Sequence, residues 1–172
     1  MNSVFYVLSG VCLGCFILRT IFNILRYRDH RWAEKKLVYR GILVTMFILW
    51  ASWFQMIFFD PLIIHIPNLI RYFGLGVFIA GVVLFILSHL QLKGFKDKGF
   101  LVRKGIYSKI RNPMYLGFIL WVFGFPLFMQ AFMTFLSGGI WVAFFVGWQR
   151  LEELELEKKY PEYKEYIKST RF

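Results

Sequence analysis

Two polar stretches carry the residue types that could do chemistry in this apolar chain. In the first, from Gly99 to Gly117, glycines, aromatics and cations alternate. Tyr107, Arg111 and Tyr115 recur there every four residues, so a helical segment would bring two phenols and a guanidinium together. Phenol rings can face a cation and a guanidinium can bind a carboxylate. An aromatic anchor belt at a membrane boundary is the alternative reading of the two tyrosines.

Asn112 and Pro113 predict the start of a helix. Proline suits the first helical turn because the N–H that it lacks would have no partner there. Asn112 is then expected to be the N-cap, and the free N–H groups behind it could bind anionic or lone-pair atoms of a ligand. Plain capping at a membrane boundary explains this pair equally well.

The second stretch runs from Trp148 to Tyr166 and holds six of the ten acidic residues. Glu155 and Lys159 are spaced i,i+4, which is typical of a solvated charged helix face. Glu152 and Glu153 lie within one turn of the expected membrane exit, where a carboxylate needs a partner. These two acids are the best candidates for binding a cationic or hydroxyl-rich ligand.

The composition indicates an integral membrane protein of one domain. Of its 172 residues, 58% are hydrophobic and 21% aromatic. The formal charge of +11 would suggest nucleic acid for a soluble domain, but in a membrane chain it predicts basic loops that face anionic lipid headgroups. Cys12 and Cys15 lie in an apolar run without a histidine cluster, so neither a metal site nor a disulfide framework is predicted.

Hydropathy predicts an all-α fold with five transmembrane helices. A crossing needs about 20 apolar residues. The uncharged stretch 113–149 has 37 residues and would be about 55 Å long as one helix, too long for one crossing. Pro126, Gln130 and the cluster at 137–139 supply breakers, so we expect a tight helical hairpin there. The predicted spans are about 3–25, 41–59, 69–90, 113–129 and 131–149.

The charge distribution supports five spans. Segments 26–40, 93–111 and 150–171 carry six, seven and six basic residues, whereas 60–68 carries none. Five crossings place all three basic segments on one side, which the positive-inside rule makes cytoplasmic. The N-terminus is then expected outside, with a short cytoplasmic helix at the C-terminus. The membrane would be the plasma membrane if the host is prokaryotic.

A few polar and small residues fall within the predicted spans. Arg19 and Arg71 are expected to snorkel towards the helix ends. Gly74, Gly76 and Gly81 are expected to permit close helix packing rather than to bind phosphate. His89, at the end of the third span, is either an interfacial polar residue or a base.

These motifs resemble the superfamily of isoprenylcysteine carboxyl methyltransferases and phospholipid methyltransferases. The resemblance covers about 99–172, with 74–94 compatible, and it implies a multi-span enzyme. Such an enzyme uses S-adenosylmethionine at the cytoplasmic boundary and takes a lipophilic or prenylated substrate sideways from the bilayer. The residues that carry it are Gly105, Tyr107, Arg111, Asn112, Pro113, Met114, Tyr115, Gly117, Glu152, Glu153, Tyr160, Tyr163 and Tyr166.

The resemblance also implies roles for individual residues. An arginine that contacts substrate precedes the glutamate pair in the family, and Arg150 is the nearby candidate, displaced from that spacing. His89 is the second catalytic candidate, because an amine acceptor would need a base and a carboxylate acceptor would not. The expected cofactor-binding residues are Gly99, Phe100, Leu101, Val102, Tyr107, Arg111, Asn112, Pro113, Met114, Tyr115, Glu152 and Glu153.

The acceptor and two rival functions stay open at this point. Isoprenylcysteine enzymes usually show Arg-His-Pro, whereas Arg111, Asn112 and Pro113 are similar to the Asn-Pro-Met-Tyr motif of phosphatidylethanolamine methyltransferases. An NADPH-dependent membrane sterol or steroid reductase shares a similar C-terminal pattern, but the acidic run 152–157 argues against binding its 2′-phosphate. A non-catalytic scaffold that binds membrane lipids is the other alternative.

Overall fold

The structure is a computed structural model, and it describes residues 3–28, 35–93, 101–170 and 172. It is all-helical, as the sequence predicts, and the described residues form no strand, only isolated bridges such as the one between Ile63 and Ala131. The helices are α1 (Ser3–Arg28), α3 (Lys36–Phe58), α4 (Asn68–Lys93), the 3-10 helix η1 (Gly105–Ser108), α5 (Pro113–Met129), α6 (Phe132–Lys159) and α7 (Tyr163–Ser169).

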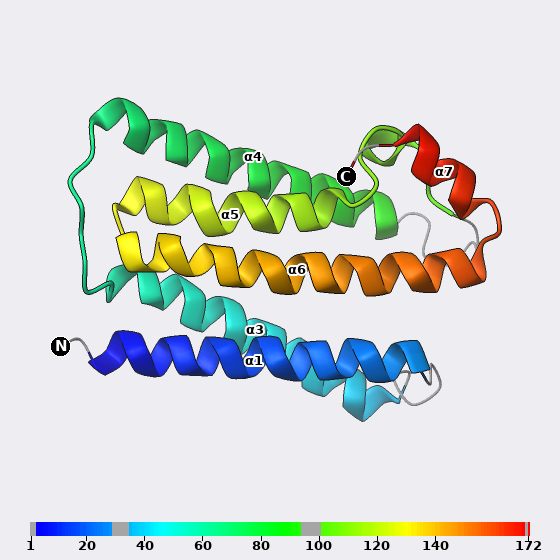
Figure 1. The fold of residues 1–172 in the computed structure, drawn as a ribbon, viewed down its shortest axis with the longest axis horizontal. Helices are drawn as coiled ribbons and strands as arrows, with labels where there is room; N and C mark the ends of the chain where they lie inside the picture. Colours follow the sequence, from blue (N-terminus) through cyan, green and yellow to red (C-terminus); the bar gives the residue numbers. More distant parts are fainter. Residues whose placement is uncertain (1–2, 29–34, 94–100, 171) are drawn as a thin grey trace.

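The long helices pack side by side in one bundle (Figure 1). α1 packs on α3, and α4 packs on α5. α6 contacts both α1 and α5, so it joins these two pairs of helices. At one end of the bundle lie the N-terminus, the α3–α4 connection and the α5–α6 turn (Figure 1). The opposite end gathers η1, α7, the start of α3 and the ends of α4 and α6, and we call it the basic end.

Four helices are long and apolar enough to cross a membrane: α1, α3, α4 and α6. α5 has 17 residues and is about 25 Å long, which is shorter than a typical span. The chain is therefore a multi-pass membrane protein. Five crossings and a cytoplasmic C-terminus stay predictions.

The α5–α6 hairpin turns at Gln130, one of the breakers expected from the sequence. Gln130 adopts a left-handed conformation with φ 63°, and its N–H bonds the carbonyl of Leu127. The other expected breakers were wrong: Pro126 lies inside α5, and residues 137–139 lie inside α6. Gly138 instead lets α6 approach the ring of Phe123.

Asp60 fixes the start of α6 from the α3–α4 connection. Its Oδ2 accepts bonds of 2.7 Å from the backbone N–H and the hydroxyl of Thr134, and its Oδ1 accepts from the N–H of Met133. The first N–H groups of a helix lack internal partners, and a carboxylate also complements the helix dipole there. The buried Asp60 thus caps a helix 70 residues later in the chain, a contact that the sequence did not reveal.

Glycines bring α4 and α5 into backbone contact. A Cβ atom at Gly81 would lie 2.7 Å from the carbonyl oxygen of Gly117, and one at Gly74 would lie 3.0 Å from that of Gly124. The expectation of close packing is confirmed for Gly74 and Gly81. It was wrong for Gly76, which faces open space.

Arg71 and the excess aromatic residues have structural uses. Arg71 donates from Nε to the carbonyl of Phe128 at 2.9 Å, so it caps the end of α5. A cluster of stacked and edge-on rings fills the centre of the bundle between α1, α3, α5 and α6. Its members include Phe16, Trp50, Phe118, Trp121, Phe145 and Trp148.

Candidate functional site

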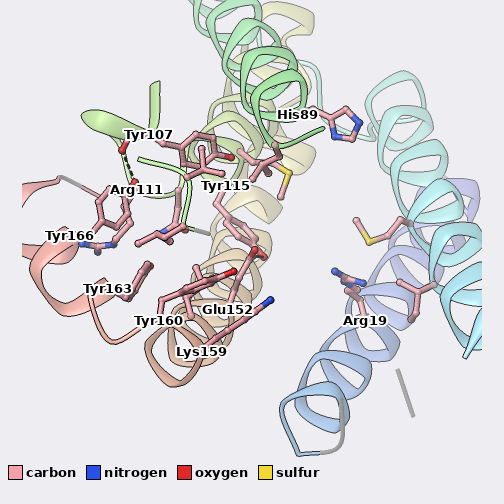
Figure 2. A pocket seen from close by; sticks show the side chains of 18 of the residues that line it. Arg19, His89, Tyr107, Arg111, Tyr115, Glu152, Lys159, Tyr160, Tyr163 and Tyr166 are labelled. Atoms are coloured by element: carbon pink, nitrogen blue, oxygen red, sulfur yellow. Dashed lines mark hydrogen bonds between the residues drawn. The ribbon is translucent and has the colours of Figure 1, made fainter. Parts of the chain in front are cut away.

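A cavity of about 760 Å³ opens at the basic end, within the range of roughly 300–1,000 Å³ that small-molecule sites occupy. It reaches from α7 and the end of α6 across to α1 and α3, and Figure 2 shows both sides. Its lining residues are Arg19, Tyr39, Ile42, Leu43, Met46, His89, Leu92, Leu101, Val102, Tyr107, Arg111, Asn112, Met114, Tyr115, Glu152, Leu156, Lys159, Tyr160, Tyr163 and Tyr166.

The two sides of the cavity differ in chemistry. The C-terminal side is rich in phenols and charges: Tyr107, Tyr115, Glu152, Lys159, Tyr160, Tyr163 and Tyr166 lie there (Figure 2). On the N-terminal side, α3 contributes the aliphatic side chains of Ile42, Leu43 and Met46. One cavity can therefore hold a polar molecule against one wall and a hydrocarbon chain against the other.

Tyr115 and Glu152 form the central polar pair of the C-terminal side. The Tyr115 hydroxyl donates to Oε2 of Glu152 at 2.9 Å. Oε1 of Glu152 has no partner within the part of the chain that the structure describes. Because Tyr115 is in the first turn of α5 and Glu152 is near the end of α6, the hairpin brings them together. Oε1 of Glu152 is thus available to a ligand.

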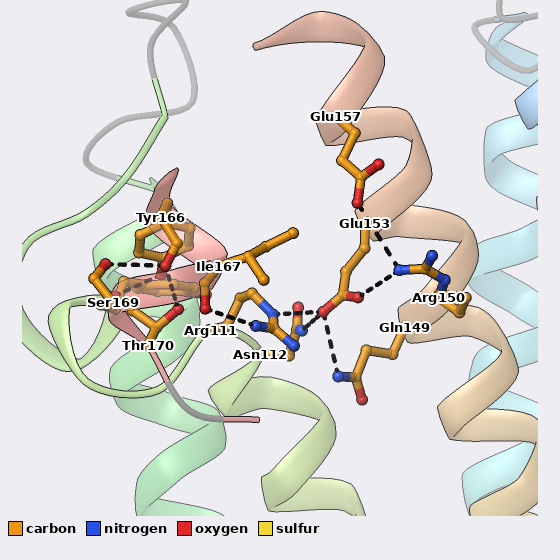
Figure 3. A network of polar contacts seen from close by, with 11 residues as sticks. Arg111, Asn112, Gln149, Arg150, Glu153, Glu157, Tyr166, Ile167, Ser169 and Thr170 are labelled. Atoms are coloured by element: carbon orange, nitrogen blue, oxygen red, sulfur yellow. Dashed lines mark hydrogen bonds and ion pairs between the residues drawn. The ribbon is translucent and has the colours of Figure 1, made fainter. Parts of the chain in front are cut away.

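Glu153 points into a different network, which holds the start of α5 (Figure 3). Its Oε1 accepts bonds of 2.7 Å from Nε of Arg111 and from Nδ2 of Asn112. Asn112 does precede α5, with Pro113 in the first turn, but its side chain makes no capping bond. The expected side-chain cap was therefore wrong, because the amide serves Glu153 instead. Glu153 does not line the cavity.

The C-terminal segment closes over η1. The hydroxyl of Tyr166 donates to the carbonyl of Tyr107, Nη1 of Arg111 reaches the carbonyl of Ile167, and the N–H of Arg111 bonds the carbonyl of Phe172. The hydroxyl of Tyr163 is buried and has no hydrogen-bond partner in the described structure. The segment thus puts one unpaired phenol beside the cavity.

The phenols around this segment are neutral at physiological pH. Burial raises the pKa of Tyr107, and the charge of Glu152 raises it further. Burial also raises the pKa of Tyr163, with Glu153 as the next cause. For Tyr166, burial raises the pKa to about 12, against the opposing charges of Arg111 and Arg103. These phenols can donate hydrogen bonds but do not act as phenolate bases near pH 7.

The structure brings most of the expected site residues to one cavity. Tyr107, Arg111 and Tyr115 meet there although 109–112 is not helical, so their four-residue spacing is not what brings them together. Arg150 does not line the cavity but pairs with Glu153 and Glu157. Pro113 and Glu153 also lie outside the lining, and Gly99 and Phe100 lie outside the described residues. The expected residues that do line it are His89, Leu101, Val102, Tyr107, Arg111, Asn112, Met114, Tyr115 and Glu152.

Sequence reasoning missed the contribution of the first two helices. Arg19 of α1 and the aliphatic residues of α3 line the cavity, although the family resemblance did not reach them. The one available signal was the charge of Arg19 within an apolar span, which was interpreted as snorkelling. The α3 residues carry no signal, because an aliphatic side chain in a membrane helix is the ordinary case.

Comparison with known proteins places the chain in a family. A search of curated proteins and one of solved structures gave no significant match. The family model described as phospholipid methyltransferase matches residues 69–163, more than half of the chain. The match runs from α4 to the start of α7 and so includes the C-terminal side of the cavity. This multi-pass membrane chain therefore belongs to the phospholipid methyltransferase family, whose members methylate lipid-like substrates.

Proposed function

We propose that the chain is an S-adenosylmethionine-dependent methyltransferase whose lipophilic acceptor enters the cavity from the bilayer. The observation that carries the proposal is the division of one cavity into two sides. A phenol- and carboxylate-bearing side from the matched family region faces an aliphatic side from α3. A methyltransferase for lipids needs both, because cofactor and acceptor must meet in one space.

The residues on the C-terminal side fit the cofactor chemically. S-adenosylmethionine carries a sulfonium cation, an ammonium, a carboxylate and ribose hydroxyls. Oε1 of Glu152 can accept from the ammonium or a hydroxyl. Aromatic faces of Tyr107 and Tyr115 suit a cation. Lys159 supplies a positive charge for the carboxylate.

In the reaction, bound cofactor supplies an electrophilic methyl group, and the protein positions the partners. Tyr115 holds the carboxylate of Glu152 in a fixed orientation through their hydrogen bond. The pairing of Tyr166 with the carbonyl of Tyr107 holds α7 against η1 and so fixes this side of the cavity. In-line displacement depends mainly on such alignment.

The acceptor chemistry decides whether a base is needed. An amine must lose its proton before it attacks, whereas a carboxylate attacks directly. His89 lines the cavity and its ring stacks on Phe85 at 6.1 Å between centroids. With an amine acceptor, His89 is the cavity residue placed to take the proton.

Calorimetry with Glu152→Gln tests the proposal. Purified wild-type protein in nanodiscs should bind S-adenosylmethionine, and Glu152→Gln should weaken that affinity at least tenfold because a charged acceptor is lost. Glu155→Gln is the matched control: Glu155 lies on the same helix but pairs with Arg26 at 2.8 Å and does not line the cavity. Its cofactor affinity should equal that of the wild type.

Two results would contradict the proposal. If the wild type binds NADPH and not S-adenosylmethionine, the cavity serves a reductase. If it binds neither, the cavity has no cofactor role. If Glu152→Gln and wild type bind S-adenosylmethionine with equal affinity, Glu152 is not part of the cofactor site. The proposed activity then depends on cofactor binding by the wild type alone.

A further inference from the structure

Arg19 is a half-buried cation on the wall of the cavity that makes no hydrogen bond or ion pair with any described residue. Its Nε is fully buried. The guanidinium carbon lies 5.1 Å from the ring centre of Phe22 and 6.0 Å from that of Trp148. The carboxylates of Glu152 and Glu155 also act on Arg19 electrostatically, but neither forms an ion pair with it. An arginine stays protonated in proteins, so this wall carries a full positive charge.

Snorkelling does not account for this placement. Arg19 lies nine residues before the end of α1, about two and a half turns or 13 Å from it. A snorkelling side chain would end in water or among headgroups, whereas Nε of Arg19 is enclosed and the residue lines the cavity. Figure 2 shows Arg19 on the wall that faces Tyr115 and Glu152. A partly desolvated charge is costly unless it is paired directly, and an anionic ligand in the cavity would supply the direct partner that the described residues do not.

The other cations of the cavity are committed elsewhere. Arg111 is paired with Glu153 at 2.7 Å and with the carbonyl of Ile167. Lys159 is exposed, and its ammonium lies over the ring of Tyr160 at 5.3 Å. Arg150, the arginine expected to contact substrate, lies outside the cavity and is paired with two glutamates. Among the described residues that line the cavity, only Arg19 is a cation with a buried nitrogen, Nε, that has no hydrogen-bond partner.

The surroundings of Arg19 indicate which ligand carries the anion. The cavity wall that α3 contributes next to α1 is mostly apolar, through Ile42, Leu43 and Met46, with the phenol of Tyr39 beside them. The cofactor-like chemistry lies on the opposite side, with Glu152 and Tyr163. An anionic group bound to Arg19 would therefore belong to a molecule whose remainder is hydrocarbon.

We propose that Arg19 binds the anionic group, phosphate or carboxylate, of an amphiphilic methyl acceptor, and that α1 and α3 together form the acceptor half of the cavity. This assignment rests on the proposed methyltransferase function. It concerns a helix outside the matched residues 69–163, and it makes α1 a determinant of substrate specificity. Arg19 acts here as a binding residue, with no part in proton transfer.

The test removes the charge from the protein and from the ligand in turn. Calorimetry in uncharged detergent compares two pairs of soluble probes. N-acetyl-S-farnesylcysteine is set against its methyl ester for the carboxylate, and dihexanoyl phosphatidic acid against dihexanoylglycerol for the phosphate. The proteins are wild type, Arg19→Gln, Arg19→Lys and the control Arg28→Gln, which removes a charge from the exposed end of the same helix.

In at least one pair, we expect wild type and Arg28→Gln to bind the anionic probe at least tenfold more tightly than its neutral counterpart. The pair that shows the preference identifies carboxylate or phosphate. Arg19→Gln should abolish this preference while leaving affinity for S-adenosylmethionine unchanged, and Arg19→Lys should retain part of it. The difference between the anionic and neutral probes in wild type is compared with the same difference in Arg19→Gln. This comparison isolates the interaction of Arg19 with the anionic group from other effects of the substitution.

Three outcomes would overturn the assignment. One is a wild type without a preference in either pair, a result that needs no variant to fold. The second is a preference that survives in Arg19→Gln. The third is a loss of affinity for S-adenosylmethionine in Arg19→Gln, which would assign Arg19 to the cofactor. Failure of the proposed function looks different: the wild type would not bind S-adenosylmethionine, whatever its preference for anionic probes.

Discussion

Substitution of Glu153 by alanine should destabilise the protein more than any other single change to an acidic residue of α6. The Glu153 carboxylate is 6% exposed and accepts two bonds of 2.7 Å, one from Arg111 and one from Asn112. Its removal leaves the guanidinium of Arg111, itself 16% exposed, with one long contact of 3.5 Å to a carbonyl. The start of α5 and the C-terminal segment then lose their shared anchor.

The magnitude follows from burial and geometry. Removing one partner of a buried ion pair costs about 3–5 kcal/mol, because the other charge is left uncompensated. Glu157→Gln is the matched control one turn later: Glu157 lies 3.9 Å from Arg150, which is 60% exposed. An exposed pair contributes about 0–1 kcal/mol. At about 2–4 °C per kcal/mol for a chain of this size, a difference of at least about 2 kcal/mol means that Glu153→Ala should melt at least about 4 °C below the control.

The free cysteines supply the assay. Cys12 and Cys15 are both buried in α1, so a thiol-reactive fluorescent dye labels them only when the bundle opens. Melting curves of wild type, Glu153→Ala and Glu157→Gln are recorded in the same detergent. The double variant Arg111→Met with Glu153→Met removes both charges and should melt above Glu153→Ala. If Glu153→Ala and Glu157→Gln melt together, the network does not hold the fold and the reasoning fails.

Two further predictions concern helix packing and pH. Gly81→Ala would place a Cβ 2.6 Å from the ring of Trp121 and 2.7 Å from a backbone oxygen, so it should cost about 1–3 kcal/mol, whereas Gly76→Ala on the same helix should not destabilise. Equal melting of the two alanine variants would exclude the close approach of α4 and α5. The pKa of Tyr166 is raised from 10.0 to about 12, so its contribution to stability is complete below pH 10 and is lost as pH rises to 12, by about 3 kcal/mol at most. The melting difference between wild type and Tyr166→Phe should be constant below pH 10 and shrink above it; a constant difference up to pH 12 would contradict the shift.

The sequence predicted the helices and the C-terminal half of the site because both depend on local signals. The uncharged run before Gln149 had to fold back, and Gln130 could adopt the left-handed turn conformation. Once the hairpin forms, the start of α5 and the end of α6 meet at one end of the bundle. The two polar stretches flank that hairpin, so the meeting of Tyr115 with Glu152 follows from topology alone.

Contacts that depend on how distant helices pack could not be predicted in this way. The sequence shows only that Asp60 begins a short segment without basic residues. Its capping of α6 depends on where α3 ends relative to the α5–α6 hairpin. The same holds for Arg19, because hydropathy shows that a charge lies in a span but not which side of the helix faces the cavity. The packing of α1 on α6 decides that, through contacts such as the bond from Trp148 to Thr20.

The adjacent glutamates illustrate how one motif serves structure and binding together. Successive residues of an α-helix point about 100° apart, so Glu152 and Glu153 cannot face the same neighbour. Glu153 turns towards Arg111 and Asn112 and fixes the start of α5. Tyr115 follows three residues after Asn112 in that helix, and its hydroxyl orients Glu152. The carboxylate that cannot reach the cavity thus positions the one that does, and loss of Glu153 should weaken cofactor binding through Tyr115 rather than through a lost contact.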